Sequence, residues 1–118
     1  MKNTNFDCLR NIDFLQKVSA DTLEGLASEC QLRNLEEREV LFSDEDKGDS
    51  MYVILSGELI VSKNEVEIAR RTKGDYIGEM ALIESQPRSA TVMSVTSSLL
   101  LEITREQFQT RLSTSSDA

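Results

Sequence analysis

The sequence predicts one mainly β domain, an all-β sandwich or barrel with short helices at its two ends. Three observations support this fold class. The chain has 118 residues, a length that suits a single domain with a real core. Its central part carries short apolar segments separated by turn residues, as antiparallel β folds do. Only the two flanks show the three- and four-residue apolar spacing of helices.

The N-terminal flank predicts a helix over residues 19–30. One apolar stripe repeats there at helical spacing and consists of Leu23, Leu26, Ala27 and Cys30. Ser19 precedes the stripe as a favourable N-cap, because its hydroxyl can accept from a free N–H of the first turn. Residues 12–18 are expected to form a short helical or irregular lead-in that packs on the same core.

After Cys30 the apolar period changes to two, which indicates strands. They are expected over residues 40–42, 51–55, 58–63, 66–70, 75–77, 90–95 and 99–103. In the last of these segments Leu99, Leu101 and Ile103 alternate, so one face of that strand should be buried.

The C-terminal flank predicts a second helix. Thr104 and Gln107 have the spacing of a capping box, and Phe108 and Leu112 supply an apolar pair four residues apart. We place the folded domain at residues 1–112 and assign residues 113–118 to a polar tail or linker.

The charge balance argues against several functions. The formal net charge is −8, from 21 acidic and 13 basic residues. Nonspecific nucleic-acid binding and polybasic membrane attachment both need an excess of Lys and Arg. No apolar segment is long enough to span a bilayer, and residues 1–11 lack a signal-peptide core. We therefore expect neither nucleic-acid binding nor membrane insertion.

Residue types that carry much common chemistry are scarce. The chain has no histidine, which excludes histidine triads and histidine-based general acid–base catalysis. Cys8 and Cys30 are expected to be reduced, consistent with a cytoplasmic location. The acidic segment 36–49 does not match a calcium loop, because an EF-hand would need a ligand at Gly48 and a bidentate Glu at Leu55. No metal site is therefore predicted.

The segment from Gly78 to Val92 is the candidate binding site. Gly78 lets the backbone approach a ligand closely, and residues 79–83 suit a single helical turn whose N–H groups could bind an anion. Pro87 ends that turn. Arg88 is a permanent cation with donors that suit a phosphate, and Glu79 can accept from a sugar hydroxyl. The alternative is a simple salt bridge between Glu79 and Arg88 on a loop.

The same segment resembles the phosphate-binding cassette of the cyclic nucleotide-binding domain family. The match rests on Gly78-Glu79, Pro87-Arg88 and Ser89-Ala90, with further similarity over 48–61 and 73–79. The resemblance covers about residues 10 to 112. It implies a β jelly roll, that is a double-stranded β-helix barrel, with short flanking α-helices.

The resemblance also implies roles for individual residues. The expected ligand-binding set is Gly78, Glu79, Met80, Ala81, Arg88, Ser89 and Ala90. Arg88 would hold the exocyclic oxygens of a cyclic phosphate, and Glu79 would accept from the ribose 2′-OH. The backbone N–H groups of Ala81 and Ser89 would complete the phosphate cradle. Gly78 and Met80 would line the ribose side.

The sequence departs from the family pattern in two respects. The family usually has glycine where Arg38 and Glu45 stand, so these residues would be strained if their turns need positive φ. Family members also usually continue into a helix that covers the base, and here the chain ends soon after Phe108. No residue for that lid is evident, although Arg71 could lie near the base.

The function implied is that of a regulatory sensor without catalytic activity and without a cofactor. It would bind cAMP, or with less support cGMP, and pass a change to an effector domain or protein partner through its terminal helices. Because position 89 is serine rather than threonine, cAMP remains the favoured ligand. The alternative is a domain of the same fold that has lost ligand binding and serves protein interaction.

Overall fold

The computed structural model describes residues 9–10, 12–16, 18–82 and 86–115. The helical elements are η1 (Asp13–Leu15), α2 (Ala20–Glu29), η2 (Glu79–Leu82) and α3 (Arg105–Ser115). The strands are β1 (Gln31–Leu35), β2 (Val40–Phe42), β3 (Lys47–Gly48), β4 (Ser50–Ser56), β5 (Glu58–Lys63), β6 (Val66–Thr72), β7 (Tyr76–Ile77), β8 (Gln86–Pro87), β9 (Thr91–Ser94) and β10 (Ser98–Thr104).

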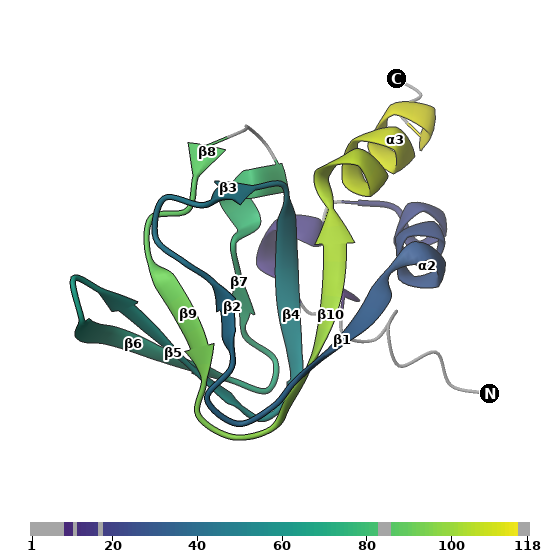
Figure 1. The fold of residues 1–118 in the computed structure, drawn as a ribbon. Helices are drawn as coiled ribbons and strands as arrows, with labels where there is room; N and C mark the ends of the chain where they lie inside the picture. Colours follow the sequence, from purple (N-terminus) through teal and green to yellow (C-terminus); the bar gives the residue numbers. More distant parts are fainter. Residues whose placement is uncertain (1–8, 11, 17, 83–85, 116–118) are drawn as a thin grey trace.

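The strands form two antiparallel four-stranded sheets and one small pair. The first sheet has the order β1-β10-β4-β7 and the second has the order β2-β9-β5-β6 (Figure 1). The pair β3–β8 lies at one end of the molecule, where it joins Lys47 to Pro87 and Gly48 to Gln86. The prediction of a mainly β domain with short helices is confirmed.

Strands β4 and β10 separate two hydrophobic clusters. On one face of β4, Met51 and Val53 pack with α2 and the lead-in, while Tyr52 and Ile54 face the second sheet. Strand β10 is buried on both faces too, because Leu101 contributes to the first cluster and Leu100 to the second. The predicted buried face of β10 is confirmed at Leu101 and Ile103. The burial of the second face was not predicted, and it arises because this strand is covered by helices on one side and a sheet on the other.

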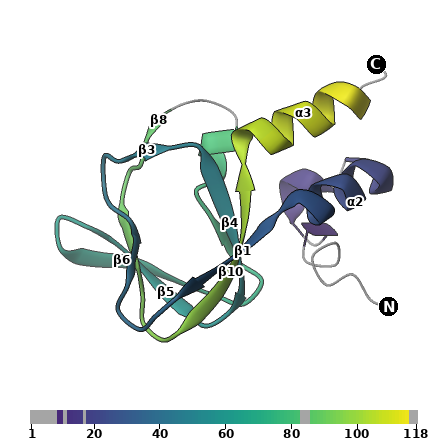
Figure 2. The same ribbon diagram turned by 45° about the vertical axis from the view of Figure 1, so that its right-hand side comes forward.

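The helices begin where the sequence predicted. The hydroxyl of Ser19 accepts from the N–H of Thr22 at 3.2 Å and so caps α2. Thr104 and Gln107 form both bonds of the capping box, each at 3.1 Å. Both helices lie on the side of the first sheet, away from β6 (Figure 2). The η2 turn and helix α3 meet beside the first sheet, where Gln109 donates to the carbonyl of Leu82 at 3.3 Å.

Several features were not predicted. Strand β1 pairs with β10, but its apolar and polar residues do not alternate clearly and most of them are exposed. Strands β3 and β8 are too short for their sequences to show a period. Helix α3 continues to Ser115 and so includes residues assigned to the tail. Both Arg38 and Glu45 have positive φ, 65° and 75°, as the comparison with the family's glycines suggested.

Candidate functional site

A cavity of about 350 Å³ lies beside the segment that the sequence singled out. Its lining includes residues 76–81 and 87–90, together with Phe42, Val61, Arg71 and Val92. Its volume is at the lower end of the range for small-molecule sites. Both halves of the predicted cassette, one on each side of residues 83–85, line the same cavity. Ile83 and the two residues after it lie outside the described part of the chain.

The backbone of Arg88 is fixed by the acidic loop that precedes β3. Its N–H donates to the carbonyl of Asp46, and its own carbonyl accepts from the N–H of Glu45, both at 2.7 Å. Because these two bonds hold the residue from both sides, the direction of the side chain is set before any ligand arrives. The acidic segment 36–49 therefore also supports the backbone of Arg88.

The guanidinium of Arg88 is buried, with 9% of the residue exposed. Its Nη2 donates to the carbonyl of Ser50 at 2.8 Å, and its Nε is buried without a hydrogen-bond partner. Burial lowers the pKa of this guanidinium, and the nearby Tyr52 and Asp49 oppose that shift. Arginine nevertheless stays protonated. The site therefore holds a buried positive charge with unused donors, which suits an anion.

Arg88 has no carboxylate partner among the residues that the structure describes. The alternative of a simple Glu79–Arg88 salt bridge is therefore wrong. Instead, Cζ of Arg88 lies 4.1 Å from the ring centroid of Phe42. Tyr52 is more distant, with its centroid 6.0 Å from the same atom.

Two glycines make room for this arginine. A Cβ on Gly48 would lie 2.5 Å from Nε of Arg88, and a Cβ on Gly78 would lie 2.6 Å from its Nη1. Gly78 also has φ +77°, in the region that side chains rarely adopt. Gly78 was selected from the sequence for close approach to a ligand. The structure shows a close approach to Arg88.

The other predicted residues are distributed around the cavity. Glu79 and Met80 line it from η2, with Met80 50% exposed, and Ser89 and Ala90 line it after Arg88. Ala81 also contributes to the lining, but its N–H donates to the carbonyl of Gly78 at 3.1 Å. That donor is used within the turn, because a 3₁₀ turn closes on the third residue back. No hydrogen bond from the N–H of Ser89 to another described residue is present.

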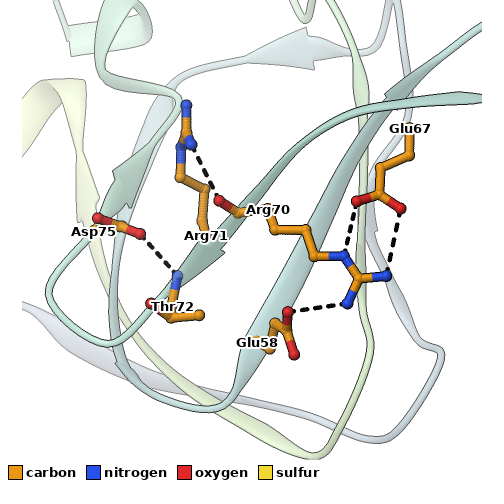
Figure 3. A network of polar contacts seen from close by, with 6 residues as sticks. All are labelled: Glu58, Glu67, Arg70, Arg71, Thr72 and Asp75. Carbon is orange, nitrogen blue, oxygen red and sulfur yellow. Dashed lines mark hydrogen bonds and ion pairs between the residues drawn. The ribbon is translucent and has the colours of Figure 1, made fainter.

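Two adjacent arginines on β6 have different surroundings. Arg70 contacts Glu67 at 2.7 Å and Glu58 at 3.0 Å. Arg71 lines the cavity, and its Nη1 donates to the carbonyl of Arg70 at 3.0 Å. Figure 3 shows the two side chains leaving the strand in different directions. Arg71 pairs across the sheet with the fully buried Leu59, so it belongs to the inner face.

Sequence reasoning missed three contributors to the site. Phe42 was assigned only to a strand, Gly48 only to the acidic segment and to the family resemblance over 48–61, and the carbonyl of Ser50 carries no side-chain signal at all. The single glycine among the acidic residues of segment 36–49 was the one available hint, since a glycine can mark a close approach. No pattern in the sequence joins these residues to Arg88, because 38 to 46 positions separate them from it.

Three further features of the described residues concern metals, membranes and thiols. They contain no group of three or more Cys, Asp or Glu side chains arranged to hold a metal ion. No helix in the same residues is both long and apolar enough to cross a membrane. Cys30 is a free thiol, and Cys8 lies outside the described part.

Comparison with known proteins identifies the class. The family described as "Cyclic nucleotide-binding domain" matches residues 32–115, and this chain belongs to it. The chain is 33% identical over 109 residues to a cAMP-dependent protein kinase regulatory subunit of Dictyostelium discoideum, covering 85% of this chain and 31% of the relative. It is also 33% identical over 100 residues to a cGMP-dependent protein kinase of Plasmodium berghei, covering 80% of this chain and 11% of that protein.

Solved structures have the same fold. A cyclic nucleotide-binding-like protein from Brucella abortus superposes with a TM-score of 0.85 at 23% identity, covering 93% of this chain and 98% of the other. A structure described as cAMP-bound PfPKA-R superposes with a TM-score of 0.80 at 25% identity, covering 95% of this chain and 40% of the other. The chain thus spans a third or less of the two curated relatives and resembles one domain of them.

Proposed function

We propose that this domain is a non-catalytic sensor that binds a cyclic purine nucleotide, cAMP before cGMP, in the cavity beside Arg88. We further propose that the two sheets form the jelly roll of the family and that residues 78–90 form its phosphate-binding cassette. The observation that carries the proposal is the buried guanidinium of Arg88, whose Nε has no partner although the side chain lines the cavity. Buried donors normally find partners, and a phosphate would provide them.

The remaining lining residues suit the rest of the ligand. Glu79 is an acceptor that lines the same cavity as Arg88 and would bind the ribose 2′-OH. Met80 would contact the ribose from η2, and Val61 offers apolar surface to the base from β5. The N–H of Ser89 would donate to the phosphate. Since the N–H of Ala81 already bonds to Gly78, binding would have to open the η2 turn slightly to recruit it.

The position of η2 supports a route by which ligand binding could change the positions of the terminal helices. Gln109 on α3 donates to the carbonyl of Leu82, the last residue of η2. Farther along α3, Arg111 pairs with Glu29 of α2 at 2.7 Å. A rearranged η2 turn would therefore pull on α3 and, through it, on α2. We propose that a partner or effector domain detects this movement.

Binding is tested by calorimetric titration of the wild type and Arg88→Ala with cAMP and cGMP. Loss of two charge-assisted bonds of about 1.5–3 kcal/mol each should lower affinity by roughly two orders of magnitude or more. Arg70→Ala serves as the control, because Arg70 carries the same charge on β6 but pairs outside the cavity. Equal affinity in the wild type and Arg88→Ala would reject the site.

The ligand-free alternative gives a different result. A wild-type protein whose melting temperature stays constant in millimolar cAMP and millimolar cGMP does not bind either nucleotide in this range. That outcome, together with a stable protein partner in a pulldown, would replace the sensor with an interaction domain of the same fold. Unfolding curves of both variants show whether a loss of affinity reflects a loss of structure.

A further inference from the structure

The contact between Phe42 and Arg88 has the geometry of a cation–π interaction. Cζ of Arg88 lies 4.1 Å from the centroid of the Phe42 ring, well within the distance of about 6 Å at which such pairs attract. Phe42 comes from β2 and is itself partly buried against the second hydrophobic cluster. The ring of Tyr52 lies beside both groups, with its centroid 6.2 Å from that of Phe42 and 6.0 Å from Cζ of Arg88. The aromatic position is thus fixed by packing.

This contact occupies a place where a counter-ion would be expected. A cation removed from water normally pairs with a carboxylate, and Arg88 has no such partner among the described residues. The negative face of an aromatic ring attracts a cation without carrying a net charge. The ring therefore stabilises the buried guanidinium without forming an ion pair with it, and Asp49, Glu102 and Asp46 act on its charge only from a distance.

The geometry also leaves the donors available. A guanidinium is planar, so a ring can stack on its face while hydrogen bonds form in its plane. One in-plane donor, Nη2, already bonds to the carbonyl of Ser50, and the buried Nε has no partner. An acidic side chain at this place would use in-plane donors and would have to be displaced by an anionic ligand. An aromatic ring does not compete for them.

We propose that Phe42 is a positioning residue for anion binding: its ring face holds the Arg88 guanidinium in place of a carboxylate. This inference rests on the proposed function in so far as the anion is the phosphate of a cyclic nucleotide. Phe42, a strand residue of the second sheet, would thus affect anion binding through Arg88. Phe42→Tyr, which keeps the ring, should therefore bind nucleotide with the affinity of the wild type, and Phe42→Leu should bind it more weakly.

The decisive measurement varies the electron density of the ring at nearly constant size. Phenylalanine carrying one, two or three ring fluorines is introduced at position 42, and the affinity for cAMP and cGMP is measured for each protein. We expect a stepwise loss of affinity with each fluorine and a total loss of about 5- to 30-fold for Phe42→Leu. The same fluorinated residues at Phe108, which packs on the helix-side core, should leave affinity unchanged.

A second readout needs no ligand. In the nucleotide-free protein, the Nε–H resonance of Arg88 should be shifted by the ring current of Phe42 and protected from exchange with water. Phe42→Leu should remove both effects, and Phe42→Tyr should retain them. This spectrum separates the two claims, because it can confirm the Phe42–Arg88 contact even if the wild type binds no cyclic nucleotide and the proposed function fails.

Two results would overturn the inference. One is an Nε–H resonance of Arg88 that is the same in the wild type and Phe42→Leu, since the ring would then not hold the guanidinium. The other is a wild type that binds nucleotide with an affinity that does not change along the fluorinated series. In that case Phe42 would contribute only shape to the cavity.

Discussion

The Cα of Gly78 lies so close to the guanidinium of Arg88 that a Cβ on the glycine would come within 2.6 Å of Nη1. The same Cβ would lie 3.1 Å from the carbonyl oxygen of Ser50, which accepts from Arg88. Gly78 thus shapes the site because it has no side chain. Any side chain here would displace the end of Arg88, because the backbone of Ser50 cannot move as easily as a long side chain.

We predict that Gly78→Ala lowers nucleotide affinity by tenfold or more, because the displaced guanidinium no longer presents its donors to the phosphate. The matched control is Gly74→Ala. Gly74 also has positive φ, +93°, but its Cβ would meet nothing within 4 Å. Both variants should lose roughly 1–2 kcal/mol of stability from backbone strain, measured by urea unfolding. Calorimetry that shows the same affinity for both variants would contradict the assignment.

Arg71 is predicted to contact the base. It lines the cavity from the inner face of β6, and four of its five donors have no hydrogen-bond partner among the described residues. A guanidinium can stack on a purine or donate to its acceptors. We expect Arg71→Ala to weaken binding by about 5- to 30-fold. The effect should be larger on cGMP if Arg71 reads the N7 edge of the base, because guanine presents two acceptors there, O6 and N7, where adenine presents only N7.

The adjacent Arg70→Ala removes the same charge from the same strand. Its ion pairs with Glu67 and Glu58 are on the surface, where they contribute little to stability. We therefore expect it to change neither affinity nor the ratio of cAMP to cGMP binding. If the two single variants bind alike in titrations with both nucleotides, Arg71 has no role in reading the base.

The stability of the domain should fall at alkaline pH through Cys30. Burial, with a smaller effect from Glu29, raises the pKa of its thiol to about 12. The unfolded chain loses this proton near pH 9, so the folded state is favoured below that pH and the benefit is lost between pH 9 and 12. We expect a loss of about 1 kcal/mol between pH 8 and 10.5, since partial exposure reduces the full linkage value.

Urea unfolding at the two pH values measures this loss. Cys30→Ala removes the thiol but retains the raised pKa values of Tyr52 and Tyr76, so its stability should depend less on pH than that of the wild type. Parallel pH profiles for the two proteins would show that the thiol is not the responsible group.

The turn before β2 should be stabilised by a glycine. Arg38 has φ +65°, a conformation that costs a residue with a side chain about 1–2 kcal/mol. We predict that Arg38→Gly raises the free energy of unfolding by about 0.5–1 kcal/mol, after the greater flexibility of glycine in the unfolded chain is deducted. Glu37→Gly is the control, because Glu37 does not have positive φ, and it should lower stability. A lower melting temperature for Arg38→Gly than for the wild type would disprove the strain.

The local elements of this protein followed from its sequence. The cap at Ser19, the capping box at Thr104 and the short turn after Gly78 all depend on residues three or four positions apart. Such signals are local, and a single sequence contains them in full. Arg88 and Glu79 were identified for the same reason, since their chemistry and their spacing from Gly78 and Pro87 are visible in one short segment.

The surroundings of Arg88 were decided by the tertiary structure. Phe42 reaches it from β2, the carbonyl of Ser50 from β4, and the backbone of Glu45 from the loop between them. The packing of the two sheets brings these groups together, although some 40 positions of the sequence separate them. Neither the hydrophobic period nor the residue type indicates which strands will be neighbours. The sequence therefore determined which cation the site would use. Packing alone determined that an aromatic ring, two glycines and a main-chain carbonyl would hold it.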